Sequence, residues 1–68
     1  MSVYKVIELV GTSEDSWEDA AVNAVTLAQQ SLRDVRVAEV IEQDMDLTAA
    51  DVITFRTKLR VSFKFEGQ

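Results

Sequence analysis

The chain has 68 residues, no Cys and no His, and its 12 acidic and 7 basic residues give a net charge of −5 at pH 7. This length predicts one domain, residues 1–68, with a small core, and the composition excludes a disulfide scaffold and a zinc site of thiolates or imidazoles. Because small domains often gain stability by self-association, we expect a homo-oligomer. The negative charge disfavours nucleic acid as a partner.

Residues Val3 to Val10 form the first predicted strand, which is apolar on both faces. A strand of this kind is central in a sheet or lies at an interface. The segment has no signal-peptide features, and no stretch approaches the roughly 20 apolar residues that span a membrane. We therefore expect a soluble, cytoplasmic protein with no membrane partner. Residues 11–16 are turn and cap residues that end the strand.

An amphipathic helix is predicted next, because small and apolar residues recur at three- and four-residue spacing. This stripe consists of Trp17, Ala20, Ala21, Ala24, Ala28, Ser31 and Leu32. Its alanines permit close approach to a sheet. We expect Trp17, in the first turn, to anchor the helix to the sheet and not to act as a ligand platform.

A second strand is predicted from Val35 to Met45, a turn over residues 46–51, and a long strand from Ile53 to Phe65. The long strand alternates without a break, so one face is apolar and the other basic. The basic face carries Arg56, Lys58, Arg60 and Lys64. The element order predicts an α+β fold, a three-stranded antiparallel sheet (β-α-β-β) with one helix on one face.

The sequence resembles the dodecin family over essentially its whole length. The resemblance rests on the stretch Val-Ile-Glu-Leu-Val-Gly-Thr-Ser at residues 6–13, on Val37-Ala38-Glu39-Val40, and on the ending Val61-Ser62-Phe63. It implies a sheet partly wrapped around the helix, and a hollow homododecamer. It also implies a non-enzymatic storage protein that binds flavin (riboflavin or FMN) in pairs between subunits.

The same resemblance points to Val37 and Arg56 as flavin-site residues. In the family pattern an aromatic residue that stacks on the flavin stands at the position of Val37, and a Gln that bonds the flavin edge stands at that of Arg56. Both are changed here. Arg56 still offers five donors and a planar group. We expect flavin binding to be weaker or differently arranged.

Acidic residues support a second hypothesis, a structural or cation-binding cage without flavin. Glu14, Asp15 and Glu18 surround the helix start, and calcium or another divalent cation takes oxygen ligands of this type. Acids at a helix N-terminus are also stabilising without metal. Some relatives in the resembled family bind calcium, and a symmetry axis can gather carboxylates from several subunits.

The basic face of the long strand has two interpretations. Acids on neighbouring strands, Glu39, Glu42 or Glu66, can balance it. Alternatively, Lys58, Arg60 and Lys64 of several subunits gather to bind a phosphate-bearing small molecule. Catalysis is not expected, because the chain lacks His, Cys and a Gly-rich phosphate loop, and Ser13 has no base to activate it.

Overall fold

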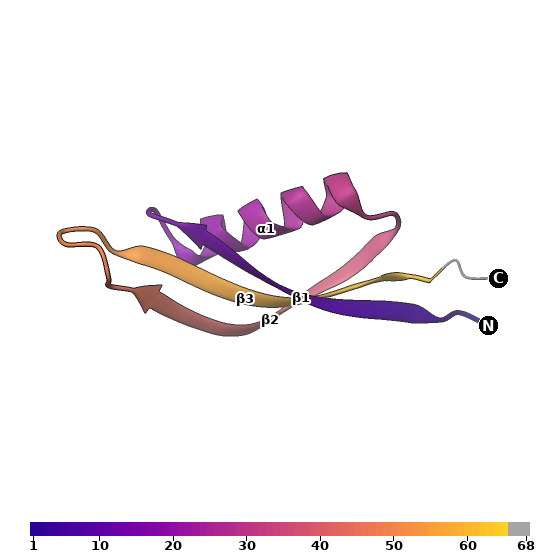
Figure 1. Cartoon of the computed structure of the whole chain (residues 1–68). Coiled ribbons are helices and arrows are strands. Elements are labelled where there is room, and N and C mark those ends of the chain that lie inside the picture. The colour runs from indigo at the N-terminus through magenta and orange to yellow at the C-terminus, as the bar shows by residue number, and fades with distance from the viewer. Residues whose placement is uncertain (66–68) are drawn as a thin grey trace.

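The computed structural model describes residues 1–65, which form three strands and one helix (Figure 1). The elements are β1 (Tyr4–Ser13), α1 (Trp17–Ser31), β2 (Val35–Asp46) and β3 (Thr54–Lys64). The predicted α+β class and β-α-β-β order are confirmed. The predicted end of the first strand is wrong, since residues 11–13 continue β1 and pair with residues 55–57 of β3.

The sheet is antiparallel in the order β1-β3-β2, so β3 is the central strand. β1 is an edge strand, so the alternative that it is central in the sheet is wrong. Val6 and Val10 of β1 are accordingly 50% and 51% exposed in the single chain. The other alternative, a strand at an interface, remains a prediction.

The alternation of β3 separates a buried face from an open one, as predicted. Thr57, Leu59 and Val61 are at most 1% exposed and lie under α1. The helix contributes the buried stripe Ala20, Ala24 and Ala28. Alanine side chains let the helix lie close to the sheet, mainly over β1 and β3. One face of the sheet is therefore covered by α1 and the other carries no helix (Figure 1).

Trp17 fastens the start of α1 to the sheet. Its ring meets that of Phe55 edge to face, with the centroids 5.0 Å apart. Its indole N–H donates to the backbone carbonyl of Asp44 at 2.9 Å. The hydroxyl of the buried Thr57 donates to the backbone carbonyl of Trp17 at 2.8 Å. These contacts hold Trp17 in the structural role expected from its place in the first turn of the helix.

Candidate functional site

The side chains of β3 that do not face the helix lie on the open face of the sheet, together with their partners on β1 and β2. We call this surface the outer face. Its members, taken from the strand register, are Val6, Glu8, Val10, Thr12, Val37, Glu39, Glu42, Asp44, Arg56, Lys58, Arg60 and Ser62. Cations line the central strand and most of the carboxylates line β2.

Arg56 and Asp44 form a bidentate ion pair on the outer face. The Arg56 Nε donates to Asp44 Oδ1 at 2.7 Å, and Nη2 donates to Oδ2 at 2.9 Å. The hydrogen bonds from Arg56 hold the pKa of the Asp44 carboxyl below its usual range, and Asp44 in turn raises the pKa of Arg56. Both side chains are 44% exposed, so solvent reaches the pair. The donors that sequence reasoning assigned to a ligand are thus engaged by a neighbouring strand.

Glu8 of β1 joins the next two cations of β3. It accepts a hydrogen bond from Arg60 Nη2 at 3.2 Å and lies 3.5 Å from Lys58 Nζ. The hydrogen bond from Arg60 and then the charge of Lys58 lower the pKa of Glu8. Arg60 also lies 3.7 Å from Glu39. Balancing of the basic strand by Glu39 is confirmed, and Glu8 is a partner that the sequence analysis missed.

The other expectations for the basic strand divide in the same way. Glu42 faces Lys58 in the register of β2 and β3. Glu66 lies outside the described residues. Collection of Lys58, Arg60 and Lys64 from several subunits around a phosphate stays a prediction, although Lys58 and Arg60 already have acidic partners within one chain.

Val37 lies on the outer face far from Arg56. It is 58% exposed and pairs in register with Ser62, six residues along β3 from Arg56. At about 3.3 Å per residue, this spacing puts roughly 20 Å between the two positions. One chain therefore does not bring the two predicted flavin-site residues together. A site that uses both needs a second subunit, which keeps the assignment a prediction.

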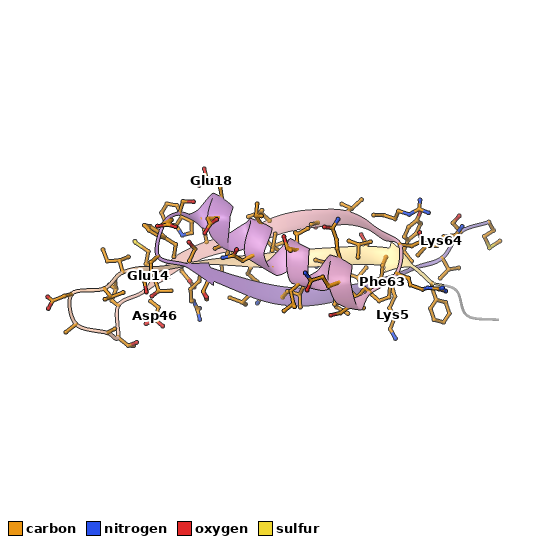
Figure 2. The ribbon with its side chains drawn as sticks, turned by 90° about the horizontal axis from the view of Figure 1, so that it is seen from above. Lys5, Glu14, Glu18, Asp46, Phe63 and Lys64 are labelled. Atoms are coloured by element: carbon orange, nitrogen blue, oxygen red, sulfur yellow. The ribbon has the colours of Figure 1, made fainter. Side chains whose placement is uncertain are left out.

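The predicted metal residues Glu14, Asp15 and Glu18 lie at the β1–α1 connection and the first turn of α1, and all three are exposed. Within residues 1–65 no group of three or more carboxylates is arranged to bind a metal ion. Figure 2 shows Glu14 and Asp46 at the end of the molecule that carries the β2–β3 loop, with Lys5, Phe63 and Lys64 at the opposite end. Metal binding at these three residues thus stays a prediction that depends on other subunits.

A hollow of about 390 Å³ lies beside Glu14. It is lined by Glu14, Asp51, Val52, Ile53 and Phe55. Asp51 belongs to the β2–β3 loop and has a positive φ of 67°, which turns the chain at this point. Sequence reasoning assigned Asp51 only to a turn, because nothing local to residues 46–51 indicates that this loop meets the one after β1.

These features define the class of the protein: a small α+β domain with one helix on an antiparallel sheet whose other face is open and charged. Among residues 1–65, no helix has the length and apolar content to cross a membrane. The Dodecin family model matches residues 3–66, nearly the whole chain. The chain belongs to the dodecin family, and the resemblance noted in the sequence is confirmed.

Two named relatives align with 94% of this chain. It is 61% identical over 64 residues to the calcium dodecin of Mycobacterium tuberculosis, covering 94% of this chain and 90% of the relative. It is 39% identical over 64 residues to the dodecin of Thermus thermophilus, covering 94% and 93% of the two chains.

Solved structures agree with the fold. The crystal structure of the calcium-chelating antigen calcium dodecin from Mycobacterium tuberculosis superposes with a TM-score of 0.88 at 57% identity, covering 98% of this chain and 96% of that one. The dodecin of Streptomyces coelicolor gives a TM-score of 0.88 at 34% identity, with coverage of 98% and 96%. The three-stranded sheet with its single helix is thus the dodecin fold.

Proposed function

We propose that this chain is a non-enzymatic storage protein that assembles into a hollow homododecamer and binds a small ligand between its subunits. Membership of the dodecin family supports the assembly. The apolar side chains that one chain leaves exposed, among them Val6, Val10 and Leu27, support it independently. The ligand is the part of the proposal that the residues of this chain must decide.

Calcium is the ligand we favour, ahead of flavin, which the sequence analysis put first. The observation that carries this choice is the 61% identity to a relative named calcium dodecin. The outer face supports the same order, because Val37 offers no aromatic ring and Arg56 is engaged by Asp44. Calcium takes six to eight oxygen ligands. Two carboxylates per subunit, Glu14 and Asp51, border one hollow, and symmetry copies would raise that number.

Equilibrium dialysis against calcium, followed by elemental analysis, tests this choice. We expect calcium to be retained by the wild-type protein, and its retention to fall when Glu14→Gln or Asp51→Asn removes an oxygen ligand. Glu39→Gln is the matched control, since Glu39 lies on the outer face near Arg60, and it should retain calcium like the wild type. An undetectable ratio of calcium to protein removes the proposal, and retention unchanged in both variants removes these two ligands.

Flavin is the second candidate, supported by membership of the dodecin family, although Val37 and Arg56 depart from the flavin-binding pattern. Quenching of flavin fluorescence by the protein tests it, and no quenching at tens of micromolar protein would remove it. We expect Val37→Trp combined with Arg56→Gln to raise the flavin affinity, because aromatic pairs contribute about 0.5–1.5 kcal/mol beyond their buried area. An unchanged affinity would mean that the flavin site lies elsewhere.

A further inference from the structure

The ion pair on the outer face has the geometry of a ligand contact. Arg56 presents Nε and Nη2 side by side, and the two oxygens of Asp44 accept from them at 2.7 and 2.9 Å. Guanidinium groups bind the carboxylate or phosphate of a ligand through the same two parallel hydrogen bonds. The Asp44 carboxylate therefore occupies the position that an oxyanion of a ligand would take on Arg56.

The backbone keeps Asp44 in this place, while solvent keeps the contact exchangeable. The carbonyl of Asp44 accepts the indole N–H of Trp17 on the helix side of the sheet, so the strand that carries the carboxylate is fixed. The two charged side chains are each 44% exposed, and exposed ion pairs are weak because water competes for both partners. Asp44 thus acts as a competitor that is always present beside Arg56 and can still be displaced.

Asp44 supplies the only carboxylate that hydrogen-bonds Arg56 among the described residues. The neighbouring cations Lys58 and Arg60 pair with Glu8, and not with Asp44. On the β1 side, the register partner of Arg56 is the uncharged Thr12. Glu42 and Asp46 act on Arg56 through their charge and form none of its hydrogen bonds. Loss of the Asp44 charge alone would therefore break the ion pair and free at least one of the two donors of an exposed guanidinium.

We propose that Asp44 is a specificity-determining residue of the outer face: by holding Arg56 it excludes ligands that carry a carboxylate or phosphate from this surface. The inference goes beyond the proposed function, since it concerns the charge of the ligands that can bind to the outer face. It does not depend on whether the assembly stores calcium. In this proposal Arg56 is bound by Asp44 of its own chain, which could not be inferred from its position in the sequence.

Two flavins serve as probes, because riboflavin and FMN share a ring and differ in one phosphate. Fluorescence quenching gives the Kd of each for the full-length protein. We expect the wild type to bind FMN no more tightly than riboflavin. In Asp44→Asn, FMN should bind at least tenfold more tightly than in the wild type, while the Kd of riboflavin changes less than twofold. Binding of FMN but not riboflavin by this variant alone would carry the same meaning.

Two further variants separate local release of Arg56 from a general change in charge. Asp44→Asn combined with Arg56→Gln should lose the gain for FMN. Asp34→Asn removes one negative charge from another surface ion pair, that with Arg36 at 3.6 Å, and should show no gain. The emission of Trp17, whose indole is bonded to the Asp44 backbone, reports that the strand keeps its place.

Several results would overturn the proposal. An FMN affinity of Asp44→Asn within twofold of the wild type, or no binding of either flavin by this variant, would show that Asp44 does not exclude phosphate ligands from Arg56. A gain that survives the loss of Arg56, or that appears in Asp34→Asn, would assign the effect to net charge. An equal gain in affinity for riboflavin would mean that the released guanidinium binds the flavin ring and not the phosphate.

Discussion

At Gly11 the backbone of β1 lies directly against α1. A Cβ at this position would lie 1.9 Å from the backbone oxygen of Ala20 and 2.9 Å from the Cβ of Ala24. Since a backbone oxygen cannot rotate away, Gly11→Ala must push α1 off β1. Overpacking of a core costs about 1–3 kcal/mol and sometimes more, and we expect this substitution to lower the free energy of unfolding by about 3 kcal/mol, measured by urea denaturation.

Thr12→Ala is the matched control for Gly11→Ala. Thr12 is the next residue along β1, its side chain lies on the outer face and is exposed, and surface substitutions of this kind usually change stability by less than about 0.5 kcal/mol. Both variants are compared at one protein concentration, because assembly contributes to apparent stability. A loss below about 1 kcal/mol for Gly11→Ala would show that the helix can move aside without much cost.

The start of α1 depends on a single cap. The Ser16 side chain accepts a hydrogen bond from the backbone N–H of Asp19 at 2.9 Å, which satisfies one of the free donors of the first turn. We expect Ser16→Ala to lower the free energy of unfolding by about 1 kcal/mol, measured by thermal or urea denaturation followed by circular dichroism. Ser16→Asn keeps a capping oxygen and should stay close to the wild type. Equal stability of the two variants would contradict this role.

The elements were predictable from the sequence, whereas the partner of Arg56 was not. Strict alternation from Val37 places residues 39, 41, 43 and 45 on the outer face and puts Asp44 on the helix side. A β-bulge between Val40 and Glu42 shifts the register by one residue, so that Asp44 turns outward. Because bulges depend on how two strands pair and not on either strand alone, the Asp44–Arg56 contact could be found only in the folded chain.

A similar limit applied to β1. Its apolar residues on both faces indicated a strand that is central in the sheet or lies at an interface, but the sequence could not distinguish these two alternatives. The register fixed the outcome, since β3 pairs with both other strands. Glu8 became a partner of Lys58 and Arg60 for the same reason, and its contact with Arg60 spans 52 residues of sequence.

The carboxylates that receive hydrogen bonds make the stability of the whole molecule depend on pH. Arg60 and Lys58 lower the pKa of Glu8, and Arg56 lowers that of Asp44. Each pKa is lower in the folded than in the unfolded chain, so the stabilisation is complete above the ordinary carboxyl range of about 4 and is lost as the pH falls through the lowered native values. We expect the Tm to fall on acidification below about pH 5, and to fall less in Glu8→Gln.

Salt provides the control for this pH dependence. The groups involved are 40–47% exposed, and the screening length shrinks from about 10 Å at 0.1 M salt to about 3 Å at 1 M. The difference between the wild type and Glu8→Gln should therefore shrink at 1 M NaCl. Identical pH profiles for the two proteins at low salt would show that the contacts of Glu8 contribute nothing measurable.

The single chain is more extended than a compact domain of the same length. Figure 1 shows its elongated shape. It measures 50 × 20 × 16 Å with a radius of gyration of 13.8 Å, against about 11 Å for a compact domain of this length. It exposes 5006 Å², whereas a compact monomer of its mass exposes about 4,300 Å². Only Leu59 and Val61 supply large apolar side chains that are less than 2% exposed in the described fold. A core of this size is marginal for an isolated domain.

Assembly is therefore expected to be a condition of folding, and the mass in solution tests it. Twelve chains of 7.6 kDa form a particle of about 91 kDa, which light scattering coupled to size exclusion distinguishes from a monomer.

Because contacts between subunits would cover Val6, Val10 and Leu27, we expect Val10→Glu to lower this mass and the Tm together. Thr26→Glu, which adds the same charge on an exposed position of α1, is the control. A wild-type species of one chain mass would contradict the assembly, and a folded monomer of high Tm would show that the small core suffices.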